Sequence, residues 1–182
     1  MLMQWDSSIL LFFQETIRNS VLTPFVVGIT TLGNAGIIWI LMSVGMLFHK
    51  KTRKIGCMGL AALVLSALVN NMILKPLIAR PRPYELISAL TPLIAKPTDY
   101  SFPSGHTAAS FAAACVFYRN LPKKAGVPLM ILAVLIALSR IYLGVHYPSD
   151  VLGGMISGVA LSYLAEWITN KVLKRRETKH DD

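Results

Sequence analysis

Long apolar runs separated by short polar turns are the main pattern along the chain. A helix that crosses a bilayer needs about 20 mostly apolar residues. Four runs have this length or nearly so, and they cover residues 56–78, 104–121, 126–143 and 151–172. A fifth run, residues 34–49, is slightly short but strongly apolar. The pattern therefore predicts an all-α fold, a polytopic transmembrane bundle of five spanning helices.

The first 32 residues follow a different pattern. Residues 6–19 mix charged and apolar side chains at helical spacing, and residues 21–32 form an apolar run too short to cross a bilayer alone. Both segments are predicted to be helices that lie at a membrane interface. The alternative is a sixth crossing somewhere within residues 6–32.

Composition supports a membrane protein with a single domain. The 182 residues are 54% apolar and only 15% charged, whereas soluble domains carry about a quarter charged residues. This balance excludes an ordinary soluble enzyme, a disordered chain and a disulfide-rich secreted module. We expect one domain over residues 1–182, with interfacial helices at 1–32, a transmembrane core at 33–172 and a basic tail at 173–182.

The net charge of +9 invites a nucleic-acid interpretation, but its distribution argues against one. Basic residues collect at the ends of apolar runs, as they do in cytoplasmic loops of membrane proteins. We therefore expect a multi-pass protein of the plasma (inner) membrane with an outer N-terminus and a cytoplasmic C-terminus. Twelve of the 18 basic residues form the three clusters: Lys50, Lys51, Arg53, Lys54; Arg119, Lys123, Lys124; and Lys171, Lys174, Arg175, Arg176, Lys179.

A group of ionisable residues breaks this rule, because the five-span topology brings it to the outer level of the membrane. Ionisable residues at such positions are candidates for function. Three are cations, two are histidines and one is a carboxylate. They are Lys75, Arg82, Arg140, His106, His146 and Asp150.

This set suits phosphoryl transfer. Three fixed cations bind a multiply charged anion, and Ser104 and Gly105 open a helix whose N–H groups point at the same anion. His146 and Asp150 are one helical turn apart, so the carboxylate is able to orient the imidazole. Spacing alone does not say which histidine attacks. The sequence offers no ligand set for a metal, and metal-independent chemistry with no cofactor is expected.

Three motifs carry a family resemblance. Residues 75–83 read KxxxxxxRP, residues 103–106 read PSGH and residues 139–150 read SRxxxxxHxxxD. In this order they resemble the signature of the PAP2 (type 2 phosphatidic acid phosphatase) superfamily. The resemblance implies a helical bundle and metal-independent phosphatase activity through a phosphohistidine intermediate.

The resemblance also implies residue roles. His146 would be the nucleophile, Asp150 the group that orients it and His106 the general acid. The phosphoryl oxygens would be bound by Lys75, Arg82, Ser104, Gly105 and Arg140. Arg80 and Lys96 lie outside the motifs, and we expect them to reach lipid headgroups or attract an anionic substrate.

The substrate is expected to be a lipid phosphate held at the outer face of the bilayer. Undecaprenyl diphosphate is the favoured candidate, with phosphatidylglycerophosphate and phosphatidate as alternatives. Residues 84–102 are expected to close over the site. An alternative of another class is a non-enzymatic lipid carrier on the same fold. The sequence does not indicate an oligomeric state.

Overall fold

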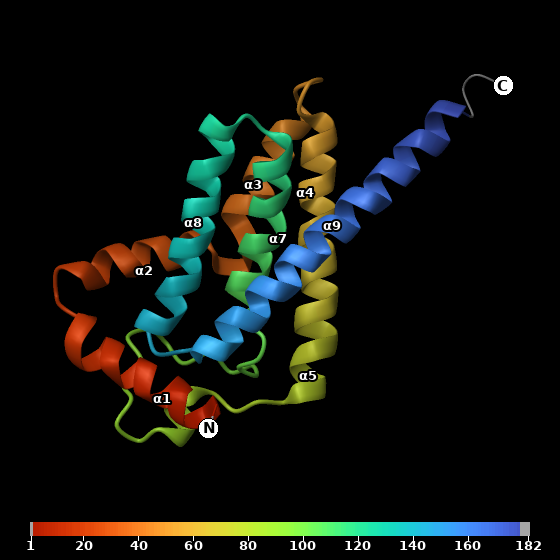
Figure 1. The fold of residues 1–182 in the computed structure, drawn as a ribbon. Helices are drawn as coiled ribbons and strands as arrows, with labels where there is room; N and C mark the ends of the chain where they lie inside the picture. Colours follow the sequence, from red (N-terminus) through yellow and green to blue (C-terminus); the bar gives the residue numbers. More distant parts are fainter. Residues whose placement is uncertain (1, 179–182) are drawn as a thin grey trace.

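Helices are the only regular secondary structure in the computed structural model, which describes residues 2–178 (Figure 1). This confirms the predicted all-α fold; residues 179–182 of the predicted basic tail lie outside the described range. The α-helices are α1 Leu2–Phe12, α2 Leu22–Leu32, α3 Ile37–Leu47, α4 Arg53–Ser66, α5 Lys75–Ile78, α6 Pro83–Leu86, α7 Gly105–Asn120, α8 Lys123–Tyr142 and α9 Pro148–Thr178. Three short segments join them: the π-helical turns η1 Phe13–Ile17 and η3 Ala67–Leu74, and the 3₁₀ turn η2 Asn34–Gly36.

Helix α7 forms the centre of the bundle and packs against α4, α8 and α9, while α3 packs on α4 (Figure 1). Small residues allow this close contact. A Cβ atom on Gly154 of α9 would stand 2.8 Å from the Ser104 carbonyl oxygen, and one on Gly158 would stand 2.6 Å from the Ala108 carbonyl oxygen. The two glycines therefore bring the backbones of α7 and α9 together.

The helices are those of a multi-pass membrane protein. Within residues 2–178, three continuous helical stretches are long and apolar enough to span: Arg53–Leu86, Lys123–Tyr142 and Pro148–Lys174. The α2 and α3 pair passes the same criterion jointly but is bent by 45° at its break. Helix α7 has 16 residues, which is below the usual spanning length. Five crossings therefore remain a prediction.

The N-terminal helices dock on the bundle. Helix α1 contacts α9, and Asp6 and Leu10 on α1 are fully buried. Helix α2 packs against α8 and leads into α3 through a break at Ala35 and Gly36, whose φ angles are +50° and +69°. Residues 2–32 are thus attached to the bundle through α8 and α9.

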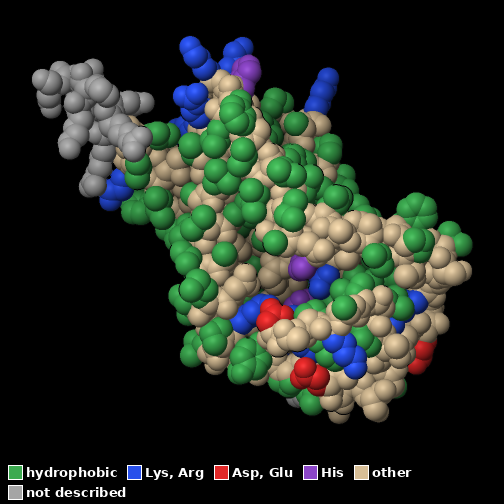
Figure 2. All heavy atoms as spheres, turned by 180° about the vertical axis from the view of Figure 1, so that it is seen from behind, with side chains coloured by type: hydrophobic (Ala, Val, Ile, Leu, Met, Phe, Trp, Pro, Cys, Tyr) green, Lys and Arg blue, Asp and Glu red, His purple; other side chains and the backbone are tan. Residues whose placement is uncertain are grey.

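The two ends of the bundle differ in charge. The α3–α4 and α7–α8 turns and the far end of α9 lie at one end, and the 79–103 loop and the α8–α9 turn lie at the other (Figure 1). Figure 2 shows Lys and Arg side chains gathered at the first end, and a mixed group of basic, acidic and histidine side chains around a hollow nearer the second. The predicted functional residues belong to the second end.

Candidate active site

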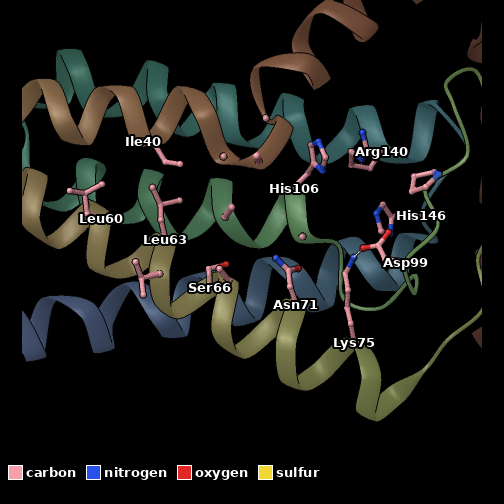
Figure 3. A pocket seen from close by; sticks show the side chains of 18 of the residues that line it. Ile40, Leu60, Leu63, Ser66, Asn71, Lys75, Asp99, His106, Arg140 and His146 are labelled. Carbon is pink, nitrogen blue, oxygen red and sulfur yellow. Dashed lines mark hydrogen bonds and ion pairs between the residues drawn. The ribbon is translucent and has the colours of Figure 1, made fainter.

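A cavity of about 600 Å³ opens between α3, α4, α7 and the 79–103 loop. Figure 3 shows its two halves: Lys75, His106, Arg140 and His146 gather at one end, and Ile40, Leu60 and Leu63 line the other. The cavity thus joins a charged pocket to an apolar groove. Six of the eight predicted functional residues line it: Lys75, Arg82, Gly105, His106, Arg140 and His146.

His146 lies in the α8–α9 turn with only 2% of its surface exposed. Arg82 Nη1 donates to His146 Nε2 at 3.3 Å. A guanidinium only donates, so Nε2 is the unprotonated nitrogen and Nδ1 carries the proton. Nδ1 faces Asp150 Oδ2 at 3.5 Å. Burial, reinforced by Arg82 and Arg140, lowers the pKa of His146 to about 4, and the free imidazole is neutral near pH 7.

Asp150 is fully buried beneath His146 and does not line the cavity. Its Oδ2 accepts hydrogen bonds from Ser101 Oγ at 2.5 Å and from the Tyr147 N–H at 2.9 Å. Its Oδ1 accepts one from Arg80 Nη1 at 2.6 Å. The carboxylate is held by these bonds with Oδ2 directed at the imidazole, which suits the orienting role that the sequence suggested.

Two of the predicted phosphate-binding cations share a carboxylate. Lys75 Nζ contacts Asp99 Oδ2, and Arg82 Nη2 donates to Asp99 Oδ1 at 2.5 Å. Arg82 is fixed further by donating to the Val145 carbonyl oxygen. Burial of Asp99 opposes its ionisation, but the charges and hydrogen bonds of Lys75 and Arg82 outweigh it and lower the Asp99 pKa to about 2.

Arg140 and His106 occupy the opposite wall, where the break between α2 and α3 supports them. Arg140 Nη1 donates to Thr30 Oγ1 at 2.6 Å, and its buried Nε has no hydrogen-bond partner within residues 2–178. Buried donors are normally satisfied, so this N–H is available to an anion in the cavity. His106 Nε2 lies 2.9 Å from Asn34 Oδ1, a distance at which a protonated Nε2 donates.

The N-terminus of α7 faces the cavity through Gly105 and His106. A Cβ on Gly105 would stand 3.0 Å from Asn71 Oδ1, so glycine keeps this wall open. Ser104 is buried and does not line the cavity: its N–H donates to the Asp150 carbonyl oxygen and its hydroxyl accepts from Thr107. Its predicted contact with phosphate remains a prediction.

Four residues of this site escaped the sequence analysis. Asp99 belongs to no motif in the sequence, and Arg80, which we expect from the sequence to reach lipid headgroups or attract an anionic substrate, instead forms ion pairs with Asp6 and Asp150. Thr30 and Asn34 lie in a segment without ionisable residues. The one usable signal was the polar stretch Thr30–Asn34 between two apolar runs.

The geometry defines what the site can do. Lys75, Arg82 and Arg140 surround one small volume with positive charge, a neutral imidazole nitrogen faces it, and a second histidine stands on the opposite wall. Such an arrangement has the groups required to bind a phosphate and to attack it. The residues are drawn from α5, the 79–103 loop, α7, α8 and the α8–α9 turn, so packing of several helices brings them together.

Known proteins are similar to this chain in sequence and in fold. An undecaprenyl-diphosphatase of Sulfolobus acidocaldarius is 37% identical over 128 residues, which cover 70% of this chain and 62% of that protein. Phosphatidylglycerophosphatase B of Bacillus subtilis is 33% identical over 177 residues, covering 88% and 82%. The crystal structure of a transmembrane PAP2 type phosphatidylglycerolphosphate phosphatase from Bacillus subtilis superimposes with a TM-score of 0.73 at 31% identity, covering 93% and 87%.

The family itself follows from the extent of the match. Residues 56–174 match the PAP2 superfamily. This range is more than half of the chain, and it contains all three motifs and every residue assigned to the charged pocket. The chain belongs to the PAP2 superfamily.

Proposed function

We propose that this protein is an integral-membrane lipid phosphatase that removes the terminal phosphate of undecaprenyl diphosphate, with undecaprenyl phosphate and inorganic phosphate as products. The observation that carries the proposal is the cavity, in which a tricationic pocket with two histidines continues into an apolar groove. Its relatives, PAP2 phosphatases with names that refer to lipid phosphates, support an enzyme of this class.

The first chemical step begins at His146 Nε2, which is the unprotonated nitrogen facing the cations. Its lone pair forms a bond to phosphorus while the bond from phosphorus to the bridging oxygen breaks. His106, in its imidazolium form, donates a proton to the departing oxygen of the lipid monophosphate and becomes neutral. The Nδ1 proton stays directed at Asp150, whose negative charge stabilises the imidazole ring as it becomes a positively charged phosphohistidine.

The second step returns the enzyme to its starting state. Water attacks the phosphorus of the phosphohistidine, His106 accepts a proton from that water, and the bond between phosphorus and Nε2 breaks. Inorganic phosphate leaves and His146 is again neutral. Lys75, Arg82 and Arg140 stabilise the charge on the phosphoryl oxygens in both steps, and they supply the positive charge that a metal ion supplies in other phosphatases.

The apolar groove supports a lipid substrate. Ile40 of α3 and Leu60, Leu63 and Val64 of α4 line the half of the cavity away from the cations. A chain lying there would bury apolar surface at about 25 cal/mol per Å², with its phosphate in the charged pocket. Phosphatidylglycerophosphate is the second candidate, because a relative and a solved structure carry that activity in their names.

Charge placement supports an outward-facing site. The basic clusters at 50–54 and 119–124 lie at the end opposite to the charged pocket (Figures 1 and 2), and the positive-inside rule assigns such clusters to the cytoplasm. The phosphate would then be hydrolysed at the extracytoplasmic face of the plasma membrane, with the C-terminus in the cytoplasm.

The test is phosphate release by purified protein in detergent containing EDTA, with undecaprenyl diphosphate, phosphatidylglycerophosphate and phosphatidate assayed in parallel. We expect release to be lost in His146→Ala and retained in His49→Ala, a histidine exposed at the basic end. Substrate labelled on its terminal phosphate should leave an acid-labile label on the wild-type protein only.

Release that survives in His146→Ala would remove His146 as nucleophile. Loss in EDTA that Mg²⁺ restores would refute metal independence, and a folded protein inactive on every substrate would favour the lipid carrier.

A further inference from the structure

A buried ionic network joins the N-terminal helix to the catalytic carboxylate. Asp6 of α1 is fully buried, 74 residues before its partner Arg80, and Arg80 also binds Asp150. We propose that Asp6 and Arg80 are positioning residues, which fix the orientation and the effective charge of Asp150 and through it the state of His146. This inference rests on the proposed function, since it assigns His146 as the nucleophile.

The contacts of Arg80 are specific. Nη1 donates to Asp150 Oδ1 at 2.6 Å and to Ser149 Oγ at 2.7 Å, and Nη2 donates to Asp6 Oδ2 at 2.7 Å. The guanidinium carbon stands 3.9 Å from the centroid of the Tyr147 ring. Stacking and hydrogen bonds from both Nη atoms together define the plane of the Arg80 guanidinium, and Arg80 therefore holds Asp150 Oδ1 while Oδ2 remains directed at His146.

Asp6 completes the network from the other side. Its Oδ1 accepts from the Ser149 N–H at 2.9 Å and its Oδ2 from Ser149 Oγ at 2.5 Å. Helix α9 begins at Pro148, so Asp6 satisfies a backbone N–H in the first turn of the helix that carries Asp150. A carboxylate is favourable at a helix N-terminus. Asp6 thereby fixes the position of both the N-terminus of α9 and the Arg80 side chain.

The charges decide what the network does to His146. Arg80 alone would neutralise Asp150, and the imidazole would lose the negative partner that stabilises it during phosphoryl transfer. Asp6 compensates Arg80, so the two buried carboxylates and the partly buried guanidinium together carry one net negative charge. The arrangement keeps Asp150 effective as an anion although an arginine binds it directly.

The other charges around His146 come from five surrounding elements and stay constant when Asp6 or Arg80 is changed. Arg82 and Arg140 lower its pKa directly, and His106 faces it from α7. Lys75 and Asp99 lie across the same cavity, and Glu85 of α6 binds the Arg82 backbone. None of these groups contacts the Asp6 carboxylate, so substitutions at Asp6 and Arg80 test the network separately.

The experiment compares Asp6→Asn, Arg80→Gln and the double variant in full-length protein. The His146 pKa is read by NMR on histidine-labelled protein, with His146→Ala to assign the signal. Asp6→Asn removes a negative charge and should lower that pKa, whereas Arg80→Gln removes a positive charge and should raise it. The double variant restores the net charge and should return the pKa toward the wild-type value. Two control variants remove a charge elsewhere in the same parts of the chain: Glu15→Gln in the N-terminal helices and Lys96→Gln in the 79–103 loop. Both should leave the His146 pKa unchanged.

Kinetics supply the second measurement. Neither Asp6 nor Arg80 lines the cavity, so we expect kcat to fall about 100-fold in Arg80→Gln through loss of alignment, with KM changed little. Arg80→Lys keeps the positive charge but loses the planar guanidinium, so the variant should retain the His146 pKa and lose part of kcat. This variant also serves if Arg80→Gln fails to fold.

Two results would overturn the proposal. One is a His146 pKa that moves in the same direction, or not at all, in folded Asp6→Asn and Arg80→Gln. The other is an unchanged kcat in Arg80→Gln. If the wild-type protein hydrolyses no lipid phosphate, the proposed function fails, whereas the NMR titration still decides whether Asp6 and Arg80 control His146.

Discussion

The Asp99 carboxylate occupies the position that the proposed function gives to a phosphate. It is bound by Lys75 and Arg82, and its pKa of about 2 keeps it ionised throughout the range in which a membrane enzyme works. About half of its side-chain surface remains exposed, so it is able to leave. A substrate phosphate must therefore displace Asp99 before both cations are free to bind it.

Removing the charge of Asp99 should strengthen phosphate binding. In Asp99→Asn we expect KM and the inhibition constant of inorganic phosphate to fall, by about tenfold or less because solvent screens a half-exposed charge. Steady-state kinetics with phosphate as inhibitor measures both. Glu85→Gln is the matched control, since Glu85 contacts the backbone of Arg82 and not its guanidinium. An increase in both constants would show that Asp99 assists binding.

In the proposed mechanism, the pKa of His146 sets the acidic limit of activity. The nucleophile must be neutral, so activity is lost as the pH falls through the pKa of His146 in the free enzyme. Burial and the nearby arginines lower that pKa to about 4, compared with about 6.5 for an ordinary histidine. We expect kcat/KM, corrected for substrate ionisation by a ³¹P titration, to keep its plateau well below pH 6.5. A limb at pH 6.5 or above would contradict this.

The proposed site residues that line the cavity were predictable from the sequence, but their supporting partners were not. Five of them could be predicted because each is an ionisable residue in a fixed motif next to an apolar run: Lys75, Arg82, His106, Arg140 and His146. Their partners follow from long-range packing: Arg140 binds a threonine 110 residues away and His106 an asparagine 72 residues away. No local pattern marks a neutral hydrogen-bond acceptor in a segment that meets its partner only after folding.

At the scale of the helices, the apolar runs predicted where the helices lie more accurately than where they begin and end. The run at 126–143 became α8 Lys123–Tyr142, because Lys123 and Lys124 continue the helix although they lack apolar character. The run at 56–78 became a continuous stack of α4, η3 and α5. The π-helical turn within it was invisible, since hydrophobic periodicity does not distinguish a wide turn from a regular one.

The α7–α9 contact makes a prediction about stability. A Cβ on Gly158 would lie 2.6 Å from the Ala108 carbonyl oxygen and 2.9 Å from Phe111 Cβ, and the backbones must separate to admit it. Gly158→Ala should therefore destabilise the protein by about 1–3 kcal/mol. Gly45→Ala on α3 is the control, because a Cβ there meets nothing within 4 Å. Thermal unfolding in detergent compares them, and equal melting temperatures would show that the contact relaxes freely.

The basic end and the proposed active site lie at opposite ends of the bundle. Its basic end carries the α3–α4 and α7–α8 turns, and the opposite end holds the charged pocket, the 79–103 loop and the docked helix α1 (Figures 1 and 2). The apolar groove between α3 and α4 extends from the pocket toward the basic end. A lipid bound with its phosphate in the pocket would thus lie with its tail along the bundle, inside the bilayer.

This polarity leads to a prediction about orientation. In a variant without Cys57 and Cys115, a cysteine at Thr98, exposed on the loop beside the pocket, should react with an impermeant maleimide in intact cells. A cysteine at Lys51, exposed at the basic end, should react only after permeabilisation. The positive-inside rule assigns the clusters at 50–54 and 119–124 to the cytoplasm, and the pocket, at the opposite end of the bundle, would then face outward. The reverse pattern would place hydrolysis at the cytoplasmic face and remove the topological argument for a lipid whose diphosphate is released outside the cell.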